Sequence, residues 1–305
     1  MKLRTIALAL LALHCSQAAT PPAASPEGES AAEGSPAASP VTQAAAAERL
    51  DAVLAAQPEE AKSRYASRHP KELLEFFDIA PGMTVVDTLP GEVFYAGILL
   101  DYLGKGGKVV LADYSPKMWT QFGDYSPDPK EKANWPTEVV GKWEAKRGPD
   151  GASLAAFQYG AVPDDMAGTV DAVLLVRAVH HFMRLESNGG YMTQALADIS
   201  KLLKPGGIVG VEQHRAPEKN SDAWAKGDAG YVKQSAVVAA FQKAGFELVG
   251  SSEVNANPKD QPTEQDVVWR LPPTLAMSKD KPEHKAQMEA IGESDRMTLK
   301  FKKPS

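Results

Sequence analysis

The segment from Pro81 to Asp113 constrains the fold more than any other part of the chain. Met83–Asp87 is a short apolar run with valines, which is typical of a strand buried on both faces. Val93–Leu103 carries apolar residues at helical spacing, and Lys108–Ala112 is a second apolar run. Parallel strands need a crossover connection, and this connection is usually a helix. Two strands that are joined through one helix are therefore expected to run parallel. The segment therefore predicts an α/β fold with a parallel sheet.

Two acidic residues mark the expected functional edge of this sheet. Asp87 ends the first strand, and Asp113 follows the second. In open parallel sheets, ligands bind outside the carboxyl ends of the strands, where the strand order reverses. We therefore expect the chemistry near these two side chains.

The remaining pattern extends the alternation of strands and helices. Further strands are expected at Ala155–Tyr159, Val170–Val176, Ile208–Val211, Phe246–Val254 and Arg296–Lys302. Helices are expected at Arg49–Ala56, Glu59–Ser67, Pro70–Phe77, Gly190–Leu203 and Ser235–Ala244. Ser115–Gly151 is interpreted as a partly helical insertion, and Asn255–Asp295 as a long loop.

Residues 1–18 are interpreted as a signal peptide, which predicts an exported, periplasmic protein. Lys2 and Arg4 precede the apolar stretch Ile6–Leu13, which is too short to span a membrane. A retained membrane anchor is the alternative. Cys15 directly follows the apolar stretch, as in bacterial lipoprotein signals, so a lipid anchor through Cys15 is a further hypothesis. Cleavage after Ala18 instead leaves no cysteine in the mature chain.

Residues 19–47 are rich in Ala, Pro and Ser and contain no aromatic residue. Such a segment buries too little apolar surface to offset the entropy of ordering, so we expect a disordered linker before a folded domain at 48–305. The net charge is −6, and no block of basic residues is present. These features argue against a nucleic-acid surface.

The ordered set of motifs resembles class I methyltransferases that use S-adenosylmethionine. The residues that carry the resemblance are the loop Asp87–Gly91, Asp113, Leu203–Gly207, Ala244–Phe246 and the terminal strand Met297–Phe301. The resemblance implies a Rossmann-like, seven-stranded methyltransferase sheet with helices on both faces and an antiparallel last strand. It also implies S-adenosylmethionine as the cofactor and a small-molecule substrate or a cell-envelope component as the methyl acceptor.

A narrower resemblance is to a group of exported bacterial proteins described as predicted methyltransferases. The matching segments are Arg68–Pro70 with Phe76–Phe77, Pro81–Val85, His214–Ala216, Asn257–Pro258 with Asp260, and Ser294–Met297.

The resemblance gives cofactor-binding roles to several residues. Asp113 is positioned to accept both ribose hydroxyls, with a simple turn residue as the alternative. Tyr114 is either a stacking partner for adenine or a packing aromatic. Gly160 and Ala161 would let backbone approach the purine ring. Asp87 would meet the ammonium group of the cofactor, or else only cap the turn.

The loop after the first strand departs from the family pattern of three alternating glycines. Those places hold Leu89, Gly91 and Val93, so only Gly91 is kept. We count Leu89 and Gly91 as cofactor-binding positions. Glu92 adds a negative charge at the start of a helix, where it either points to solvent or competes with the cofactor's carboxylate.

His180, His181 and His214 are the candidate catalytic residues. They follow the two strands expected beside the first, and adjacent residues in extended chain face opposite ways, so only one of His180 and His181 is expected in the pocket. A pocket histidine that titrates near neutrality can take a proton from an acceptor hydroxyl or amine. A backbone-bonded loop histidine is the alternative. A metal site with Glu212 lacks ligand spacing, so no metal is predicted.

Two further features complete the expected site. Arg177 and Arg215 flank the same edge and are candidates for binding an anionic group of cofactor or substrate, with surface ion pairs as the alternative. The loop Asn255–Asp295 leaves a strand at this edge and is expected to cover the pocket. Its predicted contact points are Trp269, Leu271, Pro272 and Pro273.

Two functions remain open on the sequence alone. The first is a methyltransferase, and the second is a non-catalytic ligand-binding or scaffold protein with a degenerate methyltransferase fold. A nicotinamide dehydrogenase is disfavoured because no G-x-G-x-x-G follows the first strand. The sequence predicts neither the methyl acceptor nor the oligomeric state.

Overall fold

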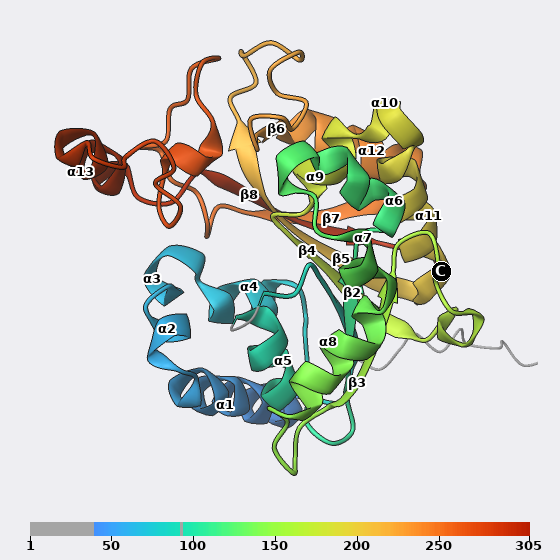
Figure 1. Cartoon of the computed structure of the whole chain (residues 1–305). Coiled ribbons are helices and arrows are strands. Elements are labelled where there is room, and N and C mark those ends of the chain that lie inside the picture. Colours follow the sequence, from blue (N-terminus) through green and yellow to red (C-terminus); the bar gives the residue numbers. More distant parts are fainter. Residues whose placement is uncertain (1–39, 92–93) are drawn as a thin grey trace, which may run out of the picture. The chain divides into compact units, whose positions relative to one another are not determined.

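A mixed β-sheet organises the part of the chain that the computed structural model describes, residues 40–91 and 94–305. The strand order is β3-β2-β1-β4-β5-β8-β7, and the short β6 pairs with β5 off this path (Figure 1). The strands are β1 (Thr84–Thr88), β2 (Lys108–Asp113), β3 (Ser153–Gln158), β4 (Val170–Val176), β5 (Leu203–Ala216), β6 (Val232–Lys233), β7 (Glu247–Ser252) and β8 (Arg296–Lys302). β1 to β5 pair in parallel, and β8 runs antiparallel to both β5 and β7. The predicted fold class is confirmed, with β6 as an addition that two residues are too few to reveal.

Helices cover both faces of the sheet. The α-helices are α1 (Pro40–Ala56), α2 (Glu59–Lys62), α3 (Tyr65–Arg68), α4 (Pro70–Phe76), α5 (Tyr95–Leu103), α6 (Pro116–Trp119), α7 (Pro129–Ala133), α8 (Trp135–Glu144), α9 (Val179–Arg184), α10 (Glu186–Gly189), α11 (Tyr191–Leu202), α12 (Gln234–Lys243) and α13 (Pro282–Ile291). The short 3₁₀ helices are η1 (Thr120–Tyr125), η2 (Asp164–Met166) and η3 (Val268–Arg270).

Alternation along the strands builds a hydrophobic core on each face. Val85 packs in a cluster with apolar residues of α1, α4, α5 and α8. Val86, the next residue, packs in a second cluster with apolar residues of α9, α11 and α12. Because successive side chains of a strand point to opposite faces, one valine-rich strand serves both cores.

The register of the sheet brings the strand ends together. Asp87 of β1 lies opposite Leu111 of β2 and Leu174 of β4. Because these strands are parallel, the loops that follow them emerge at one edge, and the strand order reverses between β1 and β4. This edge carries the candidate site.

The folded unit begins earlier than the expected boundary at residue 48. Helix α1 starts at Pro40, and it continues through the run Ala44–Ala47 that we had assigned to a disordered linker. Alanine has the highest helix propensity, and the buried Leu50 and Leu54 attach the later turns of α1 to the core. The expected signal peptide, Cys15 and most of the linker lie outside the described residues. In the described part, none of the helices combines the length and the apolarity needed to span a bilayer.

Two other elements differ from expectation. Strand β5 begins at Leu203, which pairs with Val170, and a register irregularity precedes the pairing of Ala172 with Ile208. The segment 255–295 is a loop for most of its length but contains η3 and α13.

Candidate functional site: adjoining arginine and histidine cavities

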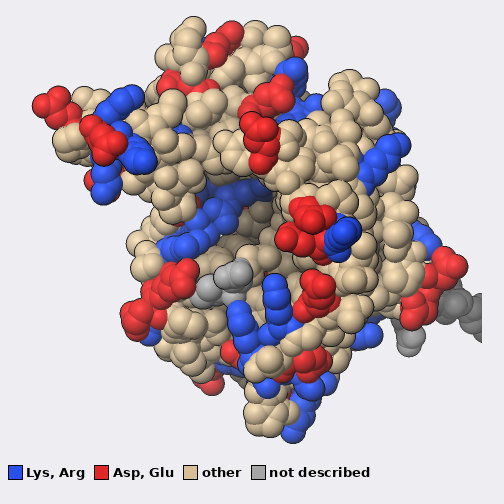
Figure 2. Space-filling view, in the orientation of Figure 1, with Lys and Arg blue, Asp and Glu red and all other residues tan. Residues whose placement is uncertain are grey.

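Two adjoining cavities lie at the carboxyl ends of β1 and β4. The arginine cavity, of about 240 Å³, is lined by residues that include Arg64, Arg68, Asp87 and Arg177. Figure 2 shows Lys and Arg side chains gathered in a hollow of this face. The histidine cavity, of about 290 Å³, is lined by His180, His181 and His214 among others. Both cavities are lined by Leu89, Val176 and Arg177, so these residues form their common wall.

Asp87 is a buried carboxyl in the arginine cavity, only 3% exposed. Burial raises the pKa of Asp87 from its usual 3.8 to about 7, against the lowering effect of a hydrogen bond from the backbone of Ala96. The predicted position of Asp87 near the carboxyl end of the first strand is confirmed. A carboxyl in this condition changes charge close to neutral pH.

Guanidinium groups line the same cavity as this carboxyl. Arg68 is buried, and its Nε donates to Glu293 at 3.1 Å. Burial is the main cause that lowers the pKa of Arg68 to about 10. The half-buried Arg177 adds a third guanidinium beside Arg64 and Arg68, so the cavity suits an anionic group.

A buried network of charged side chains holds Arg68 in place. Arg296 makes an ion pair of 2.6 Å with Glu212, although the two groups do not align as a hydrogen bond. It also donates to Glu293 at 2.6 Å and to the carbonyl of Ser67. Glu293 is shared between Arg296 and Arg68, which holds the arginine of α3 against β5 and β8.

Leu89 takes the backbone conformation that a glycine would favour. Its φ is 56°, in the left-handed region where a non-glycine residue is strained. Its partly buried side chain packs against the core cluster of β1 and lines both cavities. Gly91 lines the arginine cavity, with open space where a Cβ would lie. Glu92 and Val93 lie outside the described residues, so the two interpretations of Glu92 stay as predictions.

Asp113 is buried, and both of its carboxylate oxygens are bound within the chain. Oδ1 accepts from the backbone N–H of Tyr114 at 2.7 Å and from Nε1 of Trp119 at 3.0 Å. Oδ2 accepts from Nζ of Lys132 at 2.7 Å. Burial raises the pKa of Asp113, while the bonds from Lys132, Tyr114 and Trp119 lower it. The expectation that Asp113 accepts both ribose hydroxyls is wrong for this conformation, because Tyr114, Trp119 and Lys132 already occupy three of its about four acceptor positions.

Tyr114 is a core residue rather than an exposed stacking platform. Its side chain is fully buried, and its ring contacts Trp119, Phe122 and Phe182. The hydroxyl lies 2.8 Å from Nδ1 of His181. Of the two alternatives for Tyr114, the packing aromatic is therefore the correct one.

Gly160 and Ala161 line a different cavity of about 310 Å³. This cavity shares no lining residue with the arginine or histidine cavity. The backbone N–H of Gly160 donates to Asp198 at 2.6 Å. These two positions are therefore not brought together with Asp87, although they do border a hollow beyond the end of β3.

His180 and His181 lie at the start of helix α9 and not in extended chain. Arg177, with a φ of 55°, turns the chain out of β4 immediately before this helix. Consequently both histidines line the cavity, and the expectation that only one enters it is wrong. The ring centroids are 4.0 Å apart for His180 and His181, and 5.6 Å apart for His180 and His214.

Burial keeps the three histidines neutral. It lowers the pKa of His180 to about 4 and that of His181 to about 2, and it also lowers the pKa of His214. The expectation of a pocket histidine that titrates near neutrality is therefore wrong. These neutral imidazoles are hydrogen-bonding groups at physiological pH.

The part of the chain that the structure describes holds no group of three or more His, Cys, Asp or Glu that could bind a metal ion.

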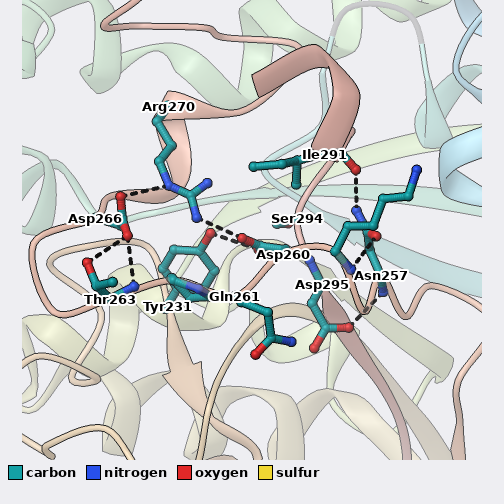
Figure 3. A network of polar contacts seen from close by, with 12 residues as sticks. Tyr231, Asn257, Asp260, Gln261, Thr263, Asp266, Arg270, Ile291, Ser294 and Asp295 are labelled. Atoms are coloured by element: carbon teal, nitrogen blue, oxygen red, sulfur yellow. Dashed lines mark hydrogen bonds and ion pairs between the residues drawn. The ribbon is translucent and has the colours of Figure 1, made fainter. Parts of the chain in front are cut away.

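The loop 255–295 reaches the histidine cavity as predicted. All four expected contact residues, Trp269, Leu271, Pro272 and Pro273, line it. A buried network holds the loop in place (Figure 3). In this network Asp260 accepts from Arg270 at 2.9 Å, from the hydroxyl of Tyr231 at 2.8 Å and from the backbone N–H of Asp295 at 3.0 Å.

Arg215 does not line either cavity. It forms ion pairs with Glu253 at 2.7 Å and with Asp295 at 2.9 Å, so the surface ion pair is the correct alternative for this residue. Sequence reasoning missed three charged residues: Arg64 and Arg68, which line the cavity of Asp87, and Lys132, which pairs with Asp113. Of these three residues, only Arg68 was marked by the sequence, because it belongs to a segment that carries the family resemblance.

Comparisons with known proteins leave the family open. No protein-family model matches the chain, and no curated protein matches it either. Among solved structures, a 4+2 cyclase named SpnF has a TM-score of 0.47 at 15% identity and covers 78% of this chain and 81% of its own. A SAM-dependent methyltransferase from Aquifex aeolicus has a TM-score of 0.44 at 18% identity, with 68% and 93% covered. Geranyl diphosphate C-methyltransferase from Streptomyces coelicolor has a TM-score of 0.45 at 13% identity, with 83% and 87% covered. The strand order of the sheet, and not these likenesses, defines the fold.

Proposed function

We propose that the chain is an S-adenosylmethionine-dependent methyltransferase that acts on a small molecule or a cell-envelope component. The observation that carries the proposal is the common wall of the two cavities, Leu89, Val176 and Arg177. A cofactor in the arginine cavity and an acceptor in the histidine cavity would meet across this wall. Both cavities lie where the strand order reverses, which is the expected ligand position in an open parallel sheet.

The residues of the arginine cavity fit the amino-acid end of the cofactor. A carboxylate suits the guanidinium groups of Arg64, Arg68 and Arg177, and an ammonium group suits the carboxyl of Asp87. When bound, S-adenosylmethionine supplies an electrophilic methyl group on its sulfonium. The residues of this chain would hold the amino-acid end in place and exclude water from the place where cofactor and acceptor meet.

The residues at the end of β2 do not fit the ribose in this conformation. Tyr114, Trp119 and Lys132 fill three of the about four acceptor positions of the Asp113 carboxylate, so it cannot accept both ribose hydroxyls. A ribose would have to replace the bond from Lys132, whose side chain belongs to the short helix α7. Cofactor binding at this end therefore requires the segment that carries Lys132 to move.

Calorimetry with S-adenosylmethionine and its demethylated product on the full chain tests the proposal. We expect micromolar binding, and we expect Asp87→Asn to weaken it roughly 10–100-fold, because a charge-assisted hydrogen bond to the ammonium group is lost. Asp165→Asn is the matched control, since Asp165 is exposed and lines none of the three cavities. Equal affinity of both variants and the unmodified chain would contradict the assigned role of Asp87.

A second variant tests the ribose end separately. Lys132→Met is expected to increase the affinity for S-adenosylmethionine about 10-fold or more, because the cofactor no longer has to displace a charged partner of Asp113. Lys130→Met on the same helix is the control, because Lys130 is exposed. An unchanged affinity in Lys132→Met would mean that the ribose does not use Asp113.

A second candidate function is a non-catalytic ligand-binding or scaffold protein. Two observations favour it, namely the internal bonding of Asp113 and the side chain of Leu89 at a glycine position. Lack of cofactor binding by both the unmodified chain and Lys132→Met would support this candidate over the enzyme.

We further propose that the chain is exported to the periplasm. The charged start, the short apolar stretch Ile6–Leu13 and the small residues near Ala18 support a cleaved signal peptide. Attachment of a lipid at Cys15 is the membrane-anchored version of the same proposal. The narrower kinship with exported bacterial methyltransferase-like proteins rests on the sequence segments described above.

A further inference from the structure

His180 carries a buried polar atom that the described part of the chain leaves without a partner. The residue is 3% exposed and lines the histidine cavity. Its Nε2 makes no hydrogen bond. A buried polar group without a partner is costly, so each such case in a folded protein requires a physical reason.

Gln213 determines which nitrogen of His180 carries the proton. Oε1 of the buried Gln213 accepts from the backbone N–H of His180 at 3.2 Å, and its Nε2 donates to the carbonyl of Gly230 at 3.1 Å. A backbone N–H can only donate and a carbonyl can only accept, so these two bonds fix the orientation of the amide. Nδ1 of His180 lies 3.1 Å from the same Oε1 and must therefore be the protonated nitrogen.

The unpartnered Nε2 is consequently a hydrogen-bond acceptor. Burial, together with the positive charges of Arg184 and Arg177, disfavours a second proton on the ring. The ring remains neutral at physiological pH and keeps its lone pair at Nε2. The chain supplies no donor for this lone pair among its described residues.

The other two histidines of the cavity have partners for Nδ1. The hydroxyl of Tyr114 donates to the carbonyl of Ala178 at 3.2 Å, so it accepts from Nδ1 of His181 at 2.8 Å. His214 faces the hydroxyl of Ser294 at 2.6 Å, and either tautomer satisfies that contact. Among the described histidines, only His180 has a buried ring nitrogen without a partner, so the requirement for a donor in the ligand comes from His180.

The rest of the cavity wall combines apolar residues with one pair of opposite charges. The apolar part includes Leu89, Val176, Val268, Trp269, Leu271 and Pro272. Arg177 and Glu293 also line the cavity, and their opposite charges interact, so the wall favours neither an anion nor a cation. Trp269 also lies near His180, with ring centroids 6.2 Å apart. The aromatic and aliphatic part of the wall suits a flat apolar body, because burial of apolar surface is favourable there.

We propose that the histidine cavity binds a neutral molecule with a flat apolar body and one hydroxyl or N–H group, which donates a hydrogen bond to Nε2 of His180. Gln213 is the positioning residue that presents this nitrogen as an acceptor. That this ligand is the methyl acceptor rests on the proposed function, whereas its binding does not.

A matched pair of probes tests the proposal on the full chain without any cofactor. 2-Naphthol has the required donor, and 2-methoxynaphthalene has the same body without it. We expect calorimetry to show about 10-fold tighter binding of 2-naphthol, since only this probe satisfies the buried acceptor. Equal affinity for the two probes, or no binding of either, would overturn the proposal.

Variants assign this preference to His180. His180→Phe is expected to bind both probes equally, while His284→Phe is expected to retain the preference, because His284 lies on α13 and does not line the cavity. Retention of the preference in His180→Phe would contradict the proposal.

A measurement on the unmodified chain covers the case in which His180→Phe fails to fold. Long-range ¹H–¹⁵N NMR of the imidazole is expected to show protonated Nδ1 and unprotonated Nε2 for His180, and Gln213→Leu is expected to yield a mixture of tautomers. Protonated Nε2 in the unmodified chain would refute the role of Gln213. Because no cofactor is present in these experiments, their outcome is independent of whether S-adenosylmethionine binds.

Discussion

Replacing Asp260 with alanine is expected to lower the free energy of unfolding by about 3–5 kcal/mol. Asp260 and Arg270 form an ion pair of 2.9 Å with side chains that are 0% and 5% exposed. Removal of the carboxylate leaves the guanidinium buried without its main counter-charge, and Nη1 of Arg270 already lacks a partner. The hydroxyl of Tyr231 and the backbone N–H of Asp295 lose their acceptor at the same time. Urea unfolding of the full chain measures the change.

Asp266→Ala is the matched control, because Asp266 bonds to the same guanidinium from a more exposed position. Its side chain is 30% exposed, and it lies 3.1 Å from Nε of Arg270 (Figure 3). A partly exposed ion pair is worth only about 0–1 kcal/mol, so the control is expected to change stability much less. Similar losses in both variants would show that burial of Asp260 is not what gives this network its strength.

The same variant tests how the loop 255–295 is attached. The Asp260 network lies next to η3, whose Trp269 lines the histidine cavity. We therefore expect trypsin to cut this loop faster in Asp260→Ala than in Asp266→Ala, under conditions where both remain folded. Cleavage at equal rates would show that other contacts hold the loop on the cavity.

The parts of the fold that sequence predicted are those in which one local pattern determines the outcome. The apolar runs of β1 and β2 and the helical spacing of α5 between them predict a buried parallel pair with a crossover, independently of the rest of the chain. Helix α1 was truncated in the prediction because its composition, rich in small residues, is equally compatible with disorder. Only its tertiary contact, through Leu50 and Leu54, distinguishes the two states.

The details of the site depend on contacts between residues far apart in sequence, and this is where prediction failed. Lys132 forms an ion pair with Asp113 because the insertion that carries it folds back onto the end of β2. This insertion has no clear periodicity in the sequence, so its path was not predictable. Arg68 meets Glu293 across 225 positions in the sequence. Conversely, the contact of Trp269 with the histidine cavity was predictable, because β7 runs in the same direction as β5 and its following loop must emerge at the same edge.

Asp87 gives the chain a stability that depends on pH, and the sign follows from its raised pKa. The unfolded chain releases the proton of Asp87 near its usual pKa of 3.8, whereas the folded chain keeps it until about pH 7. Between these values the folded state binds more protons, so the contribution of Asp87 to stability falls as pH rises. The contribution is present below about pH 4 and is lost by about pH 7. Its full size is about 4 kcal/mol, from roughly three pKa units at 1.36 kcal/mol each.

Asp87→Asn isolates this contribution, because asparagine has the shape of aspartate without its titration. The three buried histidines have lowered pKa values and act in the opposite direction, but they are the same in both proteins and largely cancel in the difference. We therefore expect the variant to gain stability relative to the unmodified chain as pH rises from about 4 to about 8, when urea unfolding is measured across this range. Since ionised Asp87 is the form that attracts an ammonium group, the affinity of the unmodified chain for S-adenosylmethionine should rise over the same interval, and that of Asp87→Asn should not. A stability difference that stays constant with pH would mean that Asp87 titrates like an exposed aspartate and is not the buried, switchable carboxyl on which the arginine cavity depends.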